Sequence, residues 1–292
     1  MDRQSQEAEA AKLISVWSPP GSPGKSTIAL SIAAELAESG KKVFLLDADT
    51  WAPSLDLQLG LAEHPAGLAA ACRLVAQERF DQEQLERLST LLSVGAGVLT
   101  VMTGLSSESR WAEVSSEKLD DLIMVASHHF DFVILDVGSP IGPGLVSLSS
   151  PVERNAVSRW AATYSDKVIA VCGADPVSIS RFLTSHSELS ELSPKGQVLT
   201  VVNRLRTSVL GSSAKQQIIQ TLARMGQIEV NGFIPDDPAA ADAAIKDSVP
   251  IALGRRSSQA RLAIALFTRT QVLGERNKLD GRLAKRAIAK LG

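Results

Sequence analysis

Cysteine, tyrosine and histidine are scarce in this sequence. The chain of 292 residues has two cysteines, Cys72 and Cys172, one tyrosine, Tyr164, and four histidines. The cysteines lie far apart and form no C-x-x-C pair, so we interpret both as small core residues in a reducing compartment. The histidines show none of the spacings typical of metal ligands. A zinc-stabilised fold and thiol redox chemistry are therefore disfavoured.

Long apolar runs and an excess of one charge are missing as well. No run approaches the length needed to span a bilayer, and residues 1–12 lack the apolar core of a signal peptide. Thirty Lys and Arg residues face 32 Asp and Glu residues, so the formal net charge of −2 supplies no general attraction to nucleic acid or anionic lipid. We expect a cytoplasmic protein that reaches the inner membrane or the nucleoid only through a local patch.

What the chain does have is a glycine-rich turn between a strand pattern and a helix pattern. The apolar run Leu13–Trp17 leads into Ser18–Thr27, and an Ala/Leu-rich helical pattern over Ser26–Ser39 follows. Such a turn directs several unpaired backbone N–H groups, and the positive end of the helix dipole, at one point. We therefore predict a P-loop for ATP, whose phosphate-binding residues are Gly21, Ser22, Gly24, Lys25, Ser26 and Thr27.

Two residues of this turn have specific roles in the prediction. The Lys25 ammonium can follow charge onto the β- and γ-phosphates, which makes it catalytic, and the Ser26 hydroxyl can bind Mg²⁺. The alternative is a Gly/Pro turn that contains Gly-Lys-Ser by chance, and the strand before it and the helix after it argue against that. Pro19 replaces the usual first glycine, and Pro23 has no N–H to donate.

Acidic residues end two of the predicted strands. Lys42–Leu46 is followed by Asp47 and Asp49, and the strand that begins at Asp131 ends at Asp136. Carboxyl ends of parallel strands share one edge, where ligands bind. We expect Asp136 to hold Mg²⁺ through water, Asp49 to orient the attacking water and Asp47 to lie in the outer shell of the metal. Acids at strand ends also serve as helix N-caps, which is the alternative for Asp49 and Asp136.

Strand and helix patterns alternate along nearly the whole chain. This order predicts one α/β domain over residues 12–272, with a doubly wound, mostly parallel sheet and helices on both faces. Two helices are predicted at 66–77 and 82–92, and a long Gly/Pro/Ser-rich loop at 137–151 is placed to sense the γ-phosphate. Residues 1–11 form a predicted flexible N-terminus and 273–292 a basic helical tail. The tail is interpreted either as a solvated helix or as a contact to DNA or a membrane.

Five motifs together resemble the ParA/MinD family of deviant Walker ATPases, within the SIMIBI class of P-loop proteins. They are Pro20–Ser26, Leu45–Asp49, Val133–Asp136, Val201–Arg204 and Gly232–Asp237. The resemblance implies an ATP-bound homodimer, slow hydrolysis and a regulatory or cargo protein as partner. It also implies adenine contacts from Asn203 and from the backbone near Pro235 to Asp237. For Asn203 the alternative is an ordinary turn residue at a strand end.

The P-loop departs from the family pattern at one place. The signature lysine of the family precedes its two glycines, and here Pro20 and Ser22 stand at the positions of that lysine and the second glycine. The CpaE/TadZ branch, which resembles this chain, shows a comparable loss. ATP binding through Lys25 and Ser26 is still expected, whereas activation of hydrolysis across a dimer is in doubt.

The resulting functional prediction is an ATP-binding positioning or partitioning switch with weak Mg²⁺-dependent ATPase activity. Its cargo, whether chromosome, plasmid, division site or pilus and secretion machinery, is not marked by any motif. The alternative is a nucleotide-dependent scaffold for a pilus or secretion apparatus that does not hydrolyse ATP. A tyrosine autokinase is disfavoured because the tail has no tyrosine cluster.

Overall fold

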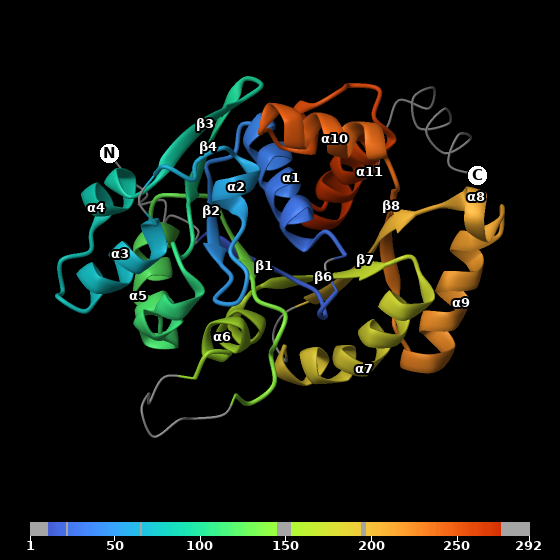
Figure 1. Cartoon of the computed structure of the whole chain (residues 1–292), viewed down its shortest axis with the longest axis horizontal. Coiled ribbons are helices and arrows are strands. Elements are labelled where there is room, and N and C mark those ends of the chain that lie inside the picture. The colour runs from blue at the N-terminus through green and yellow to red at the C-terminus, as the bar shows by residue number, and fades with distance from the viewer. Residues whose placement is uncertain (1–10, 22, 65, 145–152, 194–196, 276–292) are drawn as a thin grey trace, which may run out of the picture.

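An eight-stranded sheet forms the centre of the protein in the computed structural model (Figure 1). The structure describes residues 11–21, 23–64, 66–144, 153–193 and 197–275. The strand order is β3-β4-β2-β5-β1-β6-β7-β8. All neighbouring strands are parallel except β3 and β4, which form an antiparallel pair at one edge. The predicted doubly wound α/β fold is confirmed.

The sheet is built from short strands with buried side chains: β1 (Lys12–Trp17), β2 (Val43–Ala48), β3 (Thr90–Val94), β4 (Gly97–Met102), β5 (Phe132–Val137), β6 (Lys167–Gly173), β7 (Gln197–Leu205) and β8 (Val230–Pro235). The longer helices are α1 (Lys25–Glu38), α3 (Gly67–Val75), α5 (Ser116–Ser127), α6 (Ala156–Tyr164), α7 (Pro176–Leu192), α9 (Ala214–Gly226), α10 (Pro238–Asp247) and α11 (Gln259–Phe267). Shorter helical segments are α2 (Leu55–Gln58), α4 (Gln82–Arg87), α8 (Thr207–Leu210), the 3₁₀ turns η1 (Glu108–Glu113) and η2 (Ile251–Leu253), and the π-helical turn η3 (Thr268–Val272).

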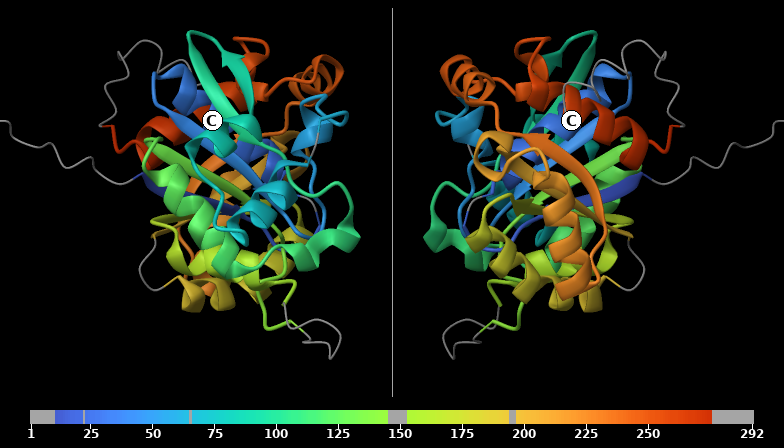
Figure 2. Two further views of the ribbon diagram at one scale, coloured as in Figure 1. Left: turned by 90° about the vertical axis from the view of Figure 1, so that its left-hand side faces the viewer. Right: turned by 90° about the vertical axis from the view of Figure 1, so that its right-hand side faces the viewer.

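Two hydrophobic cores lie on opposite faces of the sheet. One face packs against α1, η2 and α11, and the other against α3, α5, α6, α7 and α9. The side views show these two helical layers with the sheet between them (Figure 2). Alternation along the strands explains the division, because successive side chains of a strand point to opposite faces. In β2, Phe44 and Leu46 enter the core on the side of α3 and α5, while Val43 and Leu45 enter the core on the α1 side.

The same alternation positions two acids. Asp47 continues the series of Val43 and Leu45, and Asp136 continues that of Phe132 and Ile134, so both point to the face that α1 covers. The parallel register places Asp47 directly beside Asp136. Helix α1, which begins at Lys25, therefore starts next to a pair of buried carboxylates.

The prediction of a helix at 82–92 is wrong in its second half. Helix α4 ends at Arg87, and residues 90–94 form strand β3, which pairs with β4 in an antiparallel hairpin. Val94 pairs with Gly97, which leaves a two-residue turn, and Gly95 in that turn has a φ of 56°. A glycine at positive φ suits such a tight turn, and the run of apolar residues before it is equally compatible with a strand.

The ends of the chain are only partly described. The predicted segments 1–11 and 273–292 lie outside the described residues except for Ala11 and residues 273–275, as does the stretch 145–151 of the predicted long loop. Within the described part, none of the helices is long and apolar enough to cross a membrane.

Candidate functional site

The predicted site residues meet at the carboxyl edge of the sheet. The P-loop follows β1, Asp47 and Asp49 end β2, Asp136 ends β5, Asn203 lies near the end of β7 and Pro235 ends β8. Neighbouring parallel strands bring β2, β5, β1, β6 and β7 side by side, as the topology requires (Figure 1). Of the predicted P-loop residues, Ser22 lies outside the described part of the chain.

The P-loop backbone depends on its glycines. Gly21 has a φ of 125° and Gly24, the N-cap of α1, a φ of 93°. Residues with a side chain rarely adopt these conformations. A Cβ at Gly24 would lie 2.6 Å from Nδ2 of Asn203, so a side chain there would also collide with the Asn203 side chain of β7. Lys25, Ser26 and Thr27 follow in the first turn of α1, where backbone N–H groups have no helical acceptor.

Lys25 lies almost buried at the centre of the site. Its Nζ is 2.6 Å from Oδ2 of Asp49 and 3.3 Å from Oδ1 of Asp136, and it donates a hydrogen bond to the carbonyl of Val137. Burial would lower the pKa of Lys25, but the carboxylates of Asp136 and Asp49 outweigh it and raise the pKa above its ordinary value. The predicted lysine therefore binds β2 and β5 together.

Asp136 is the best-placed residue for a metal ion. It is fully buried, and its Oδ1 forms an ion pair with Lys25 at 3.3 Å, but neither oxygen accepts a hydrogen bond of ordinary geometry from a described residue. Burial raises its pKa, while Lys25 and the Ser26 hydroxyl oppose that rise. Buried carboxylates without such bonds are costly unless another group binds them. The arrangement fits Mg²⁺, with Ser26 and Asp136 as the residues that would hold it.

No group of three or more His, Cys, Asp or Glu residues is placed to hold a metal within the described ranges. The two cysteines are buried and unpaired, and burial raises the pKa of each thiol to about 12. Their interpretation as core residues agrees with this environment.

The carboxylate of Asp47 binds backbone N–H groups of the loop that follows β2. Its Oδ2 accepts hydrogen bonds from the N–H groups of Ser54 and Leu55, at 2.8 and 3.0 Å, and its Oδ1 accepts one from Asp49. Burial, with a contribution from Asp136, raises its pKa to about 7. The helix-cap alternative considered for Asp49 thus describes its neighbour, because Asp47 caps the first turn of α2.

Both carboxylate oxygens of Asp49 are engaged. Oδ2 pairs with Lys25, and Oδ1 accepts the N–H groups of Trp51 and Ala52 at 2.8 and 2.9 Å. Burial would raise the pKa of Asp49, but Lys25 and these two N–H groups lower it below its ordinary value. Asp49 is therefore ionised and lies beside the P-loop lysine, as a residue that orients water would need to be.

The residues predicted near the adenine have structural contacts. Nδ2 of Asn203 donates to the carbonyl of Pro23 at 2.7 Å, so β7 holds the P-loop backbone directly. The Asp237 side chain caps α10 through the N–H of Ala240 and accepts the Ser258 hydroxyl and the Gln259 N–H at the start of α11. The backbone from Pro235 to Asp237 stays at the same edge of the sheet, where the predicted adenine contact requires it.

Sequence reasoning missed a connection between two loops of the site. The Arg154 guanidinium donates two hydrogen bonds to the Thr50 carbonyl, and the Thr50 hydroxyl donates to the Arg154 carbonyl at 3.0 Å. The same guanidinium lies 3.8 Å from the centre of the Trp51 ring. We call this connection the Thr50–Arg154 clamp. It ties the loop after Asp49 to the segment before α6, and no sequence motif marks it.

Arg181 was also missed. It belongs to α7, and its Nη1 donates to the carbonyl of Pro20 at 3.2 Å. Nothing in the local sequence of α7 indicates that this arginine reaches the P-loop, which lies about 160 residues earlier in the chain.

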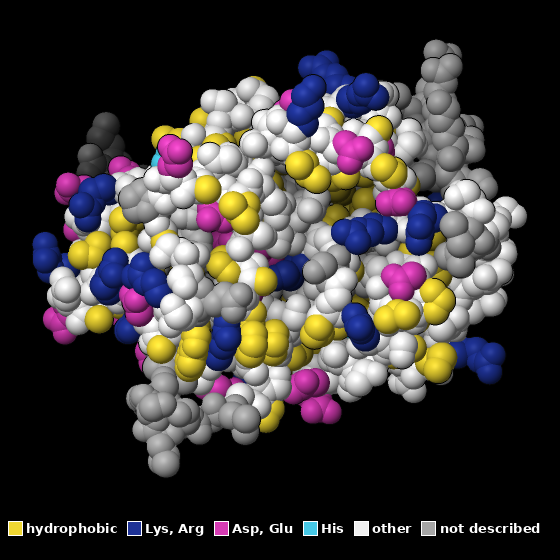
Figure 3. All heavy atoms as spheres, in the orientation of Figure 1, with side chains coloured by type: hydrophobic (Ala, Val, Ile, Leu, Met, Phe, Trp, Pro, Cys, Tyr) yellow, Lys and Arg dark blue, Asp and Glu magenta, His cyan; other side chains and the backbone are white. Residues whose placement is uncertain are grey.

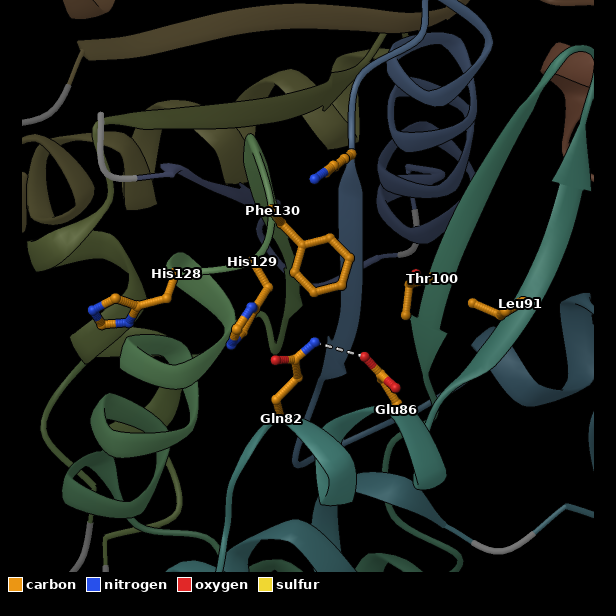
Figure 4. A pocket seen from close by; sticks show the side chains of 8 residues that line it. Gln82, Glu86, Leu91, Thr100, His128, His129 and Phe130 are labelled. Atoms are coloured by element: carbon orange, nitrogen blue, oxygen red, sulfur yellow. Dashed lines mark hydrogen bonds between the residues drawn. The ribbon is translucent and has the colours of Figure 1, made fainter. Parts of the chain in front are cut away.

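A hollow lies at the opposite edge of the sheet from these residues. It is lined by Lys42 and Phe130, which precede β2 and β5, together with Gln82, Glu86, Leu91, Thr100, His128 and His129 (Figure 4). The side-chain amide of Gln82 donates to Glu86 across it at 2.8 Å. None of the P-loop residues or strand-end acids takes part in this hollow.

Comparison with known proteins agrees with this geometry. The profile of the CobQ/CobB/MinD/ParA nucleotide binding domain matches residues 14–251. The chain belongs to this family. The septum site-determining protein MinD of Synechocystis is 26% identical over 231 residues, covering 77% of this chain and 76% of that protein.

Solved structures of ParA and MinD proteins share the fold of this ParA/MinD-family chain. A ParA family ATPase from Chlorobium tepidum superposes with a TM-score of 0.70 at 20% identity, covering 89% of this chain and 98% of the other. MinD from Pyrococcus horikoshii, crystallised with Mg-ADP, superposes with a TM-score of 0.68 at 18% identity, covering 90% and 97%. These structures share the fold, and the family match makes the chain a nucleotide-binding P-loop protein of the ParA/MinD type.

Proposed function

We propose that this protein is an ATP-dependent switch that positions or partitions a cargo and hydrolyses ATP slowly with Mg²⁺. The observation that carries the proposal is the placement of Lys25 between Asp49, Asp136 and the Val137 carbonyl at the start of α1. The P-loop backbone at residues 21–27 forms the phosphate-binding cradle. Asp49, Asp136 and the Val137 carbonyl hold the Lys25 ammonium near this cradle, and they compete with phosphate for it. Filling of the cradle by ATP would therefore free Asp49 and the Val137 carbonyl at the end of β5 together.

Each residue has a separate task in this proposal. The N–H groups of Gly21, Ser22 and residues 24–27 bind phosphate oxygens, and the Lys25 ammonium neutralises their charge. Ser26 and Asp136 hold Mg²⁺, which would supply charge neutralisation for the phosphates. Asp49, once released by Lys25, accepts a hydrogen bond from the attacking water. Asn203 and the backbone from Pro235 to Asp237 border the adenine.

The switch would act as a homodimer formed on ATP binding, with a regulatory or cargo protein as its partner. Support comes from membership of a family that includes septum-site and partition ATPases. The basic stretch 273–292 is the proposed contact to a membrane or to DNA in the cytoplasm. Figure 3 shows positive and negative side chains intermingled on one face of the described residues.

A non-hydrolysing scaffold is the second candidate. It is favoured by the contacts of Asp49, whose two oxygens are already occupied by Lys25, Trp51 and Ala52. It is also favoured by Pro20, which stands in place of the signature lysine as in the CpaE/TadZ branch. In this candidate ATP is bound and retained, and the assembly with a pilus or secretion apparatus depends on binding alone.

Sedimentation and phosphate release together test the proposal. The wild-type protein should shift from monomer to dimer with Mg-ATP or a non-hydrolysable analogue, and Lys25→Ala should remain monomeric. Slow phosphate release that Asp49→Ala abolishes supports the switch. Absence of release above background for the wild type, with dimerisation intact, supports the scaffold. A dimer that forms equally without nucleotide contradicts both candidates.

A further inference from the structure

Arg181 is held against the P-loop by the packing of its own helix. Helix α7 begins after β6, which lies beside β1 in the sheet, and Asp175 caps it through the N–H groups of Val177 and Ser178. Phe182 is fully buried, and its ring lies 6.4 Å from that of Trp17, the last residue of β1. The neighbouring Arg181 therefore extends over the turn that follows Trp17.

The guanidinium lies at the glycine that opens the cradle. Nη1 of Arg181 is 3.2 Å from the Pro20 carbonyl, and a Cβ on Gly21 would lie 2.5 Å from the same nitrogen. Such a distance is far below any normal contact, so the lack of a side chain at Gly21 leaves the space that the guanidinium fills. The arginine is thus seated on the backbone that would surround the phosphates.

Most of the hydrogen-bonding capacity of Arg181 is unused. A guanidinium has five N–H donors, and among the described residues only the Pro20 carbonyl accepts from it. Its side chain is exposed, and no carboxylate in the described part of the chain pairs with it. A bond to a neutral carbonyl is roughly half as strong as one to a phosphate oxygen, so an incoming phosphate would attract this group away from Pro20.

We propose that Arg181 binds the terminal phosphate of an ATP held in the P-loop of the same chain, and so makes the site prefer ATP to ADP. This inference rests on the proposed nucleotide site and adds the group that distinguishes the two nucleotides. Lys25 approaches the cradle from α1, whereas Arg181 approaches it from the side of Pro20 and Gly21. A planar, always charged guanidinium is suited to bidentate binding of phosphate oxygens.

Equilibrium titration with two ligands tests the inference. Mg-AMPPNP, which carries the terminal phosphate, and Mg-ADP, which lacks it, are titrated into wild type, Arg181→Ala, Arg181→Lys and a matched control. Arg224→Ala is that control, because Arg224 is exposed on α9, the helix that packs beside α7. Removal of a charged hydrogen bond predicts a loss of about tenfold or more in AMPPNP affinity for Arg181→Ala, with ADP affinity within about twofold of wild type.

The other outcomes are distinct. Arg181→Lys should keep part of the preference for AMPPNP over ADP, because the positive charge remains while the bidentate donor geometry of the guanidinium is lost. Arg224→Ala should bind both ligands as wild type does. Equal losses for both ligands would show that Arg181 only supports the loop, and no loss would show no contact; either result overturns the inference. A loss confined to protein concentrations at which the dimer forms would overturn the assignment to the same chain. Failure of the wild type to bind either nucleotide would overturn the proposed function as well.

Discussion

Glu35 on α1 is a carboxyl group outside the site whose charged form is disfavoured by burial. Its Oε1 is buried without a hydrogen-bond partner among the described residues, and Nε of Arg261 is 4.0 Å away. Burial and the nearby Glu38 raise its pKa to about 7, although Arg261 and Arg269 oppose the rise. The folded protein therefore keeps a proton on Glu35 at pH values where the unfolded chain has lost it.

This imbalance predicts a specific pH dependence of stability. Because the folded state binds the extra proton, the contribution of Glu35 to the free energy of unfolding falls as pH rises from about 4.5 towards 7. Glu35→Gln should remove that fall and stabilise the protein by about 1 to 2 kcal/mol at pH 8 relative to wild type. Urea unfolding at pH 5 and pH 8 measures it. Glu83→Gln, at an exposed position on α4, should follow the wild-type curve. Parallel curves for Glu35→Gln and wild type would contradict the account.

The strand-end acids show what residue-level sequence reasoning can reach. The period of two along β2 and β5 was enough to place Asp47, Asp49 and Asp136 at one edge with Lys25. It did not reveal that Asp47 caps α2. The N–H groups of Ser54 and Leu55 reach the Asp47 carboxylate only when the loop folds back over β2. Arg181 was out of reach for a similar reason, since its partner Pro20 is distant in sequence.

At the scale of elements, one side chain joins two helices behind the site. Asp237 accepts hydrogen bonds at the start of α10 and at the start of α11, and these bonds outweigh the effect of burial and lower its pKa. Its neighbour Asp236 is exposed and makes no hydrogen bond from its side chain to any described residue. The pair offers a matched comparison.

Loss of this shared cap should be costly. Asp237→Ala should lower the free energy of unfolding by about 2 kcal/mol, since a single N-cap contributes about 0.5 to 2 kcal/mol and two helix starts are affected. Asp236→Ala should change it by less than about 0.5 kcal/mol. Because the pKa of Asp237 is lower in the folded protein than in the unfolded chain, the cap stabilises the protein at neutral pH. This stabilisation is complete above the pKa of the unfolded chain and is lost as pH falls through the pKa of the folded protein. Equal stability of the two variants in chemical denaturation would refute the shared cap.

The Thr50–Arg154 clamp makes a prediction about motion. Removal of the guanidinium in Arg154→Ala breaks the hydrogen bonds to Thr50 and the stacking on Trp51 together. Amide hydrogen exchange should therefore become faster in both segments, around residues 50–53 and 153–155, while α1 keeps its protection. Arg224→Ala should leave both segments unchanged. Faster exchange in only one of the two would show that they are not coupled.

Most elements of the fold could be predicted from hydrophobic periodicity because the parallel strands are buried on both faces and the helices are bounded by clear signals. Helix α1, for example, ends as expected before Gly40, whose φ is 86°. Strand β3 was missed because Leu91 and Leu92 continue an apolar pattern from α4 and a short edge strand has no periodicity of its own. Pairing with β4, a tertiary interaction, decides its structure.

At the scale of the whole molecule, the sheet order explains why one small region gathers so many functions. The central strands β2, β5, β1, β6 and β7 present the strand-end acids, the P-loop, the cap of α7 and Asn203 along a single edge. Helices of both layers begin there, α1 on one face and α7 on the other. A ligand in the cradle would thus contact elements from both layers.

The central claim is that the cradle at the start of α1 binds ATP through Lys25. The most direct measurement is equilibrium titration of a fluorescent ATP analogue with Mg²⁺ into wild type and Lys25→Ala, after circular dichroism has shown that both are folded. We predict saturable binding to the wild type and a loss of at least about a hundredfold in the variant, because a buried cation at the phosphates is removed. Equal binding by the two proteins would contradict the claim.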